Sequence, residues 1–199
     1  MPQTYYRKAT LDHFARQTLN LYDPQLLLGE PTATPIDRII EFDYGIRIEY
    51  VYLRANGNEL GKMIYDDGFA GIFNPETQEY EITSVSSGTM LIDEQLLPPA
   101  SPGRLRFTQA HELAHWILHK DFFTDSYIAA AAYKFDNNIK SGMEWQANYF
   151  ASELLMPSVQ VKKAYYNSNT TQPGKIFSLA NIFNVSYQAM SICLNATAL

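Results

Sequence analysis

The sequence contains very little cysteine, with Cys193 as the single example in 199 residues. A disulfide within the chain and a cysteine-rich metal site are therefore both excluded. Long hydrophobic runs are also missing, since no apolar stretch approaches the roughly 20 residues that cross a bilayer. Residues 1–17 contain no apolar stretch typical of a signal peptide. We therefore expect a cytoplasmic protein with no membrane partner.

Positive charge is scarce where a nucleic-acid-binding surface would need it. The formal net charge is −6, and Lys175 is the single charged residue from Gln172 to Leu199. This segment resembles a helix-turn-helix, because Ala180 and Asn184 lie near the positions of its small residue and its turn residue. Phosphate contacts require several cations. We therefore predict that these two helices dock on the core or on a partner and do not bind DNA directly.

The composition is that of a folded chain, with 46% apolar and 18% charged residues. The spacing of apolar residues predicts a helix over residues 10–20. A short helix is predicted to follow a cap at Thr34, to carry Pro35 in its first turn and to end at Gly45.

A strand-rich region and then a helical region follow. Runs of β-branched and aromatic residues predict five strands, over residues 46–53, 61–65, 68–73, 80–85 and 88–92. Asn56-Gly57 is typical of a hairpin turn, and residues 125–135 are expected to be helical or loosely ordered. The order of these elements predicts an α+β fold, in which a small, mostly antiparallel sheet packs on helices.

Three of the four histidines lie within nine residues, in the segment RFTQAHELAHWILH. His111, Glu112 and His115 match the HExxH motif of zinc proteases. Positions i and i+4 share one face of a helix, so both imidazoles can reach one zinc ion, and Glu112 can reach a water molecule there. The alternative is a solvated helix face with scattered histidines, but a strong apolar stripe surrounds the motif.

His119 repeats the four-residue step that separates His111 from His115. Eight residues of helix rise about 12 Å, so one ion cannot bind His111 and His119 from a straight helix. The longer HExxHxxGxxH motif is also absent, because residue 118 is Leu118 and residue 121 is Asp121. We expect His119 to support the site from outside the ligand set, to face the substrate or to be structural.

A catalytic zinc usually has a third protein ligand and an open position. The segment SGMEWQANYFASELLMP offers Glu144 and Glu153, which point to opposite sides of a helix. Glu144 lies about 70° from the centre of the apolar stripe and Glu153 about 110°, so Glu144 is the predicted ligand. Asn148, one turn later, is expected either to accept the other N–H of a metal-bound histidine or to be a boundary residue.

A capping box is the competing explanation for Glu144. Ser141 and Glu144 have the Ser-x-x-Glu spacing in which the carboxylate binds a backbone amide at the start of a helix. The carboxylate would then not bind metal. This explanation fails if the helix begins before Gly142.

The two segments together resemble the ImmA/IrrE-type zinc metallopeptidases, over about residues 30–160. That family pairs a helix reading R-F-T-x-A-H-E-x-G-H with one reading E-x-x-A-N-x-F-A-x-x-L-L-M-P. Ala114 departs from the glycine that is frequent in the family, and alanine is small enough to pack similarly. The resemblance implies these roles: zinc ligands His111, His115 and Glu144, catalytic base Glu112, and Asn148 at the family's asparagine.

The resemblance also implies a compact glutamate-zincin, in which the sheet packs on the HExxH helix. It implies a bacterial or phage-borne endopeptidase that cleaves a repressor-type DNA-binding protein. We expect the substrate to add as a strand to a sheet edge of this chain near residues 88–92. We predict one domain over residues 1–168 and a docked helical pair over residues 169–199. The alternative function is a partner-binding regulator whose metal site is structural or silent.

Overall fold

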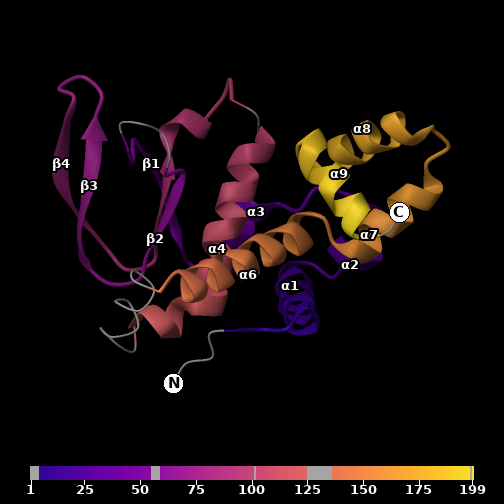
Figure 1. Cartoon of the computed structure of the whole chain (residues 1–199), viewed down its shortest axis with the longest axis horizontal. Coiled ribbons are helices and arrows are strands. Elements are labelled where there is room, and N and C mark those ends of the chain that lie inside the picture. Colours follow the sequence, from indigo (N-terminus) through magenta and orange to yellow (C-terminus); the bar gives the residue numbers. More distant parts are fainter. Residues whose placement is uncertain (1–4, 55–58, 101, 125–135, 198) are drawn as a thin grey trace.

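The computed structural model describes residues 5–54, 59–100, 102–124, 136–197 and 199. The predicted turn at Asn56-Gly57 and the predicted segment 125–135 lie outside these residues. The helical elements are α1 (Lys8–Tyr22), α2 (Gln25–Leu28), α3 (Ile36–Arg38), the π turn η1 (Ile39–Asp43), the 3-10 turn η2 (Glu94–Leu96), α4 (Pro102–Thr124), α6 (Asn137–Leu155), α7 (Ser158–Asn167), α8 (Gln172–Phe183) and α9 (Tyr187–Ala196) (Figure 1). The strands are β1 (Arg47–Val51), β2 (Gly61–Ile64), β3 (Gly68–Asn74), β4 (Glu79–Val85) and β5 (Thr89–Asp93).

The five predicted strands form two small sheets. One has the order β1-β5-β2, and the other is the hairpin β3-β4. β5 pairs in parallel with β1 and antiparallel with β2, and its five residues are all buried. Two of the three pairings are therefore antiparallel, as predicted. The expectation that a substrate strand adds near residues 88–92 is wrong, because β5 is hydrogen-bonded on both sides, whereas β2 is an edge of this sheet among the described strands.

Helix α4 stands between the β1-β5-β2 sheet and the C-terminal helices, and α6 crosses it (Figure 1). Small residues at the crossing allow the two helices to approach closely. Ala110 and Ala114 on α4 and Ala147 and Ala151 on α6 are each 0% exposed. This close approach brings the polar residues beside these alanines on the two helices into one site.

One helix start differs from the sequence expectation, and another decides between the two explanations of Glu144. The hydroxyl of Thr34 donates to the carbonyl of Leu154 at 2.8 Å, so Thr34 does not cap α3. Helix α6 begins at Asn137, where the side chain of Asp136 accepts from two backbone amides. The capping box at Ser141 is therefore excluded. Glu144 lies beyond the first turn of α6, so its side chain can face another helix.

The C-terminal pair packs on the same core as the rest of the chain. Leu179, Phe183, Met190 and Leu194 belong to the cluster that contains most of the buried apolar residues of α4 and α6. Asn184 takes a left-handed φ of 51° between α8 and α9, as its predicted place in the turn requires. The boundary after residue 168 stays a prediction.

Helix α4 holds this pair through two contacts at its beginning. Arg106 donates to the carbonyl oxygens of Thr34 at 2.7 Å and Asn184 at 3.1 Å. A Cβ atom added to Gly103 would lie 2.7 Å from the backbone nitrogen of Ser186, so only glycine permits this approach.

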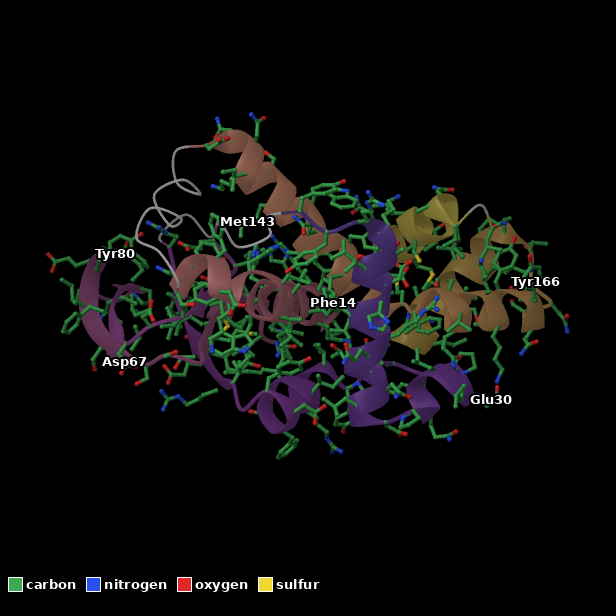
Figure 2. All side chains as sticks on the ribbon, turned by 90° about the horizontal axis from the view of Figure 1, so that it is seen from below. Phe14, Glu30, Asp67, Tyr80, Met143 and Tyr166 are labelled. Atoms are coloured by element: carbon green, nitrogen blue, oxygen red, sulfur yellow. The ribbon has the colours of Figure 1, made fainter. Side chains whose placement is uncertain are left out.

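Seen from below, α1, which carries Phe14, runs across the middle of the molecule (Figure 2). Tyr80 of the hairpin lies at one end and Tyr166 of α7 at the other. None of the described helices has the length and apolar character needed to cross a membrane.

Candidate metal centre

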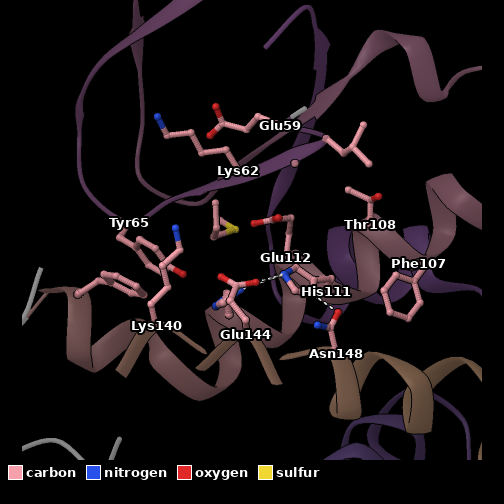
Figure 3. Close-up of a pocket in the computed structure, with 15 residues that line it drawn as sticks. Glu59, Lys62, Tyr65, Phe107, Thr108, His111, Glu112, Lys140, Glu144 and Asn148 are labelled. Carbon is pink, nitrogen blue, oxygen red and sulfur yellow. Dashed lines mark hydrogen bonds and ion pairs between the residues drawn. The ribbon is translucent and has the colours of Figure 1, made fainter. Parts of the chain in front are cut away.

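Helices α4 and α6 bring two histidines and one carboxylate together (Figure 3). The Nε2 atom of His111 lies 3.1 Å from the Nε2 atom of His115. The carboxylate of Glu144 is 3.2 Å from Nε2 of His111 and 3.5 Å from Nε2 of His115. The two histidines come from successive turns of α4, and Glu144 reaches them from the facing side of α6.

This triangle has the dimensions of a metal site. Ligand atoms about 2.0–2.1 Å from a tetrahedral ion lie about 3.3 Å from one another. The three separations between His111, His115 and Glu144 fall on both sides of that value. Two imidazoles and a carboxylate also form a donor set suited to a divalent transition metal. These residues can therefore hold one metal ion and leave a position open toward the cleft.

The carboxylate of Glu112 lies on the sheet side of the triangle. Glu112 is 8% exposed, and the backbone N–H of Met63 in β2 donates to it. Burial raises the pKa of Glu112 above its usual range, although the charges of His115 and His111 act in the opposite direction. A carboxylate held in this way is a suitable proton acceptor at the edge of the cleft.

Strand β2 approaches Glu112 closely because residue 61 is glycine. A Cβ atom at Gly61 would lie 2.7 Å from Cγ2 of Thr108 and 2.8 Å from Oε1 of Glu112. No sequence motif predicts a role for Gly61, because that role arises only where β2 packs against α4.

Asn148 and His119 contact the outer nitrogens of the two histidines. Nδ1 of His111 lies 3.1 Å from Oδ1 of Asn148, which can only accept, so Nδ1 carries the proton and Nε2 is the free donor atom for metal. Nδ1 of His115 lies 3.0 Å from Nδ1 of His119.

His119 is neutral in this environment. Burial, followed by the charge of His115, lowers the pKa of His119 to about 3. A neutral His119 can accept the Nδ1–H of His115, which again leaves Nε2 of His115 for the metal. His119 is 1% exposed and lies behind His115, so it does not face a substrate.

Replacing His119 by alanine is expected to lower metal affinity about 10–100-fold, because His115 loses the partner that fixes its ring and tautomer. Competition titration with a chromophoric chelator measures this change. His13 is the exposed fourth histidine, and His13→Ala is the matched control. Equal affinities of the two variants would remove His119 from the site.

The protonation of His111 competes with metal. Burial lowers the pKa of His111, but the hydrogen bond with Glu144 and the charges of Glu112 and Glu144 raise it by more, and the net pKa is above the ordinary value. A metal ion must therefore displace a proton from this imidazole at mildly acidic pH.

The candidate ligands His111, His115 and Glu144 face a cleft of about 790 Å³ between α4, α6 and β2, which we call the metal cleft. Tyr65 and Lys140 line the cleft at one end and Phe107 at the other (Figure 3). Tyr65 stacks on Phe123, with ring centroids 4.7 Å apart. The sequence does not predict the aromatic and cationic groups at this end, because they meet only where the end of β2, α4 and α6 come together.

Glu153 lies away from this cleft. Its carboxylate accepts from the backbone amide of Ser158 at 3.3 Å, at the start of α7. The structure thus places Glu144, and not Glu153, beside the histidines.

The sequence matches peptidase family M78, described as the IrrE N-terminal-like domain, over residues 73–195, which include α4 and α6. Among solved structures, a Mycobacterium tuberculosis transcriptional regulator is similar, with a TM-score of 0.51 and 15% sequence identity. The match covers 94% of this chain and 46% of the chain of that regulator. That likeness concerns the fold alone, and this chain spans less than half of that protein. No curated protein matches the chain.

The resemblance to the ImmA/IrrE-type proteins is confirmed by this match, and so is the compact α+β, zincin-like fold. The family implies a metallopeptidase, and the His-His-Glu group supplies a place for its metal. The matched residues make up more than half of the sequence, and the chain belongs to the IrrE N-terminal-like family of M78 peptidases.

Proposed function

We propose that this protein is a zinc-dependent endopeptidase, with His111, His115 and Glu144 as zinc ligands and Glu112 as the catalytic base. The observation that carries the proposal is the triangle of ligand atoms with the buried carboxylate of Glu112 beside it. Zinc bound there would act as a Lewis acid on the scissile carbonyl and make water a nucleophile near neutral pH.

The residues of the chain would divide the remaining work. Glu112 would take the proton from the attacking water and later give it to the leaving amine. The Met63 N–H and the close contact at Gly61 would hold that carboxylate in place. Among the described strands, the edge of β2 that faces away from β5 runs along the cleft. An extended substrate can pair with its backbone groups other than the Met63 N–H, which donates to Glu112.

Gly61→Ala is expected to lower the rate of peptide cleavage about 100-fold with little change in metal content. The added methyl group must displace β2 or Glu112, and a misplacement of about 1 Å at a reacting group has an effect of this size. Gly68→Ala, in β3, meets no atom within 4 Å and is the control. A Gly61→Ala protein with unchanged cleavage would show that this approach does not position Glu112.

We propose a repressor-type DNA-binding protein as the substrate. The family resemblance supports this choice. The test is incubation of the zinc-loaded protein with repressors encoded beside its gene. The expected result is a discrete cleavage that Glu112→Gln abolishes, and intact repressors throughout would contradict the assignment.

A partner-binding regulator with a structural metal is the second candidate, and the similarity in fold to a transcriptional regulator favours it. The two candidates differ in what metal removal does. A structural site loses folding with the metal, whereas a catalytic site loses mainly activity. Circular dichroism of the chelated protein separates them. In either case we propose that the helical pair from residue 169 onward serves docking and does not bind DNA.

A further inference from the structure

We propose that a second cavity, beside the metal cleft, binds apolar side chains of the peptide substrate on the C-terminal side of the cleaved bond. This inference rests on the proposed peptidase function and specifies its substrate. The cavity has a volume of about 550 Å³, within the range of pockets that enclose a ligand. It lies between the first half of α4, the last half of α6 and the α8–α9 segment.

The cavity continues the metal cleft. Phe107 and Asn148 line both spaces. Phe107 lies one helical turn before His111, and Asn148 lies one turn after Glu144 and bonds to His111. One turn is about 5.4 Å, whereas an extended peptide advances about 3.3 Å per residue. A substrate residue two or three positions from the cleaved bond therefore reaches the cavity.

The walls of the cavity favour an apolar occupant. Phe107, Met156, Val185, Ala189 and Ile192 contribute apolar surface, and Ile192 is 61% exposed. Burial of apolar surface there would favour binding of aliphatic or aromatic side chains.

The charge of the cavity wall further restricts which substrate side chains can bind. Arg104 is the single charged side chain among the described residues that line the cavity. A substrate segment with lysine or arginine at this place would be repelled, and a segment of neutral apolar residues would not. The C-terminal helical pair, which lacks the cations for DNA, thus supplies part of a wall that selects the substrate.

The direction of β2 decides which side of the cleaved bond enters. Gly61, at the start of β2, faces Thr108, whereas Tyr65, just after its end, stacks on Trp116 with centroids 6.0 Å apart. Strand β2 therefore runs in the same direction as α4. A peptide paired antiparallel with β2, the more frequent arrangement, runs from Tyr65 toward Phe107. Its residues after the cleaved bond then point to the second cavity.

The test uses two fluorescein-labelled decapeptides that differ only in a central Leu-Phe or Ser-Ser pair. Fluorescence anisotropy measures their binding to the full-length, zinc-loaded Glu112→Gln protein. We expect the Leu-Phe peptide to bind about tenfold more tightly. Ala189→Trp, which fills the cavity, should remove this difference, and Ala196→Trp on the same helix should retain it. Equal binding of the two peptides would overturn the proposal.

A second pair of variants tests whether a loss of binding reflects misfolding or a change in the cavity wall. Ile192→Ser alters an exposed wall residue, and Ile182→Ser alters an exposed isoleucine outside the cavity. Only Ile192→Ser should weaken binding of the Leu-Phe peptide, by about three- to tenfold. If both variants bind as the unmodified protein does, the cavity is not the binding site. A dimer that dissociates on Ala189→Trp would show that a second copy occupies it, which also overturns the proposal.

Cleavage of a peptide library by the wild-type protein separates this inference from the peptidase function. Leu, Phe, Ile or Met should be enriched at the second or third position after the cleaved bond. Cleavage without that preference would refute the subsite and retain the peptidase. Preferential Leu-Phe binding that depends on Ala189, without any cleavage, would retain an apolar binding site and refute the peptidase.

Discussion

Glu112→Gln is expected to abolish peptide cleavage and to leave the metal in place. Glutamine keeps the size of Glu112 but cannot accept a proton, and the loss of a general base lowers rates about 10²–10⁴-fold. The three predicted ligands are unchanged, so metal content should match that of the wild-type protein. Cleavage of a quenched fluorescent peptide library and metal analysis of the same sample give the two values.

Glu94→Gln provides the control for this substitution, because Glu94 is exposed in η2 and outside the cleft. Its rate should equal that of the wild-type protein. Wild-type cleavage by Glu112→Gln would mean that another group is the base. Loss of metal from Glu112→Gln would instead mean that Glu112 takes part in binding the ion.

Glu144→Ala is expected to lower metal affinity more than about 100-fold, beyond the effect of losing an outer partner such as His119. The substitution removes one of the three predicted ligands and leaves the two imidazoles, whose Nε2 atoms are 3.1 Å apart, without a carboxylate beside them. Cleavage should fall with metal occupancy. Metal titration followed by mass spectrometry under native conditions measures the occupancy.

Glu153→Ala is the matched control, since Glu153 lies on the same helix and contacts Ser158 away from the cleft. It should bind metal as the wild-type protein does. If Glu144→Ala retained full metal affinity, the third ligand would have to come from elsewhere. If it unfolded when metal was removed, while the wild-type protein remained folded, Glu144 would be structural.

The predictable parts of the site depend on helical periodicity. The four-residue spacing places His111 and His115 on one face, and the apolar stripe of α6 turns Glu144 inward. Both relations are local, because each depends only on residues within one helix. The same periodicity distinguishes Glu144 from Glu153 without any information on tertiary structure.

The unpredicted parts depend on contacts between elements distant in the sequence. The parallel pairing of β1 with β5 joins residues about 40 positions apart, and neither strand encodes its partner. Threonine frequently caps helices, but the hydroxyl of Thr34 donates to the carbonyl of Leu154, 120 residues away. The role of Gly61 likewise depends on the approach of β2 to Glu112, which no pattern of neighbouring residues predicts.

The most direct test of the central claim is a count of new peptide N-termini produced by the purified protein from a denatured protein mixture. Three states are compared: zinc-loaded, stripped with a chelator, and reloaded with zinc. Zinc-dependent peptidase activity predicts many new N-termini in the first state, none above background in the second and recovery in the third. Equal numbers in all three states would contradict it.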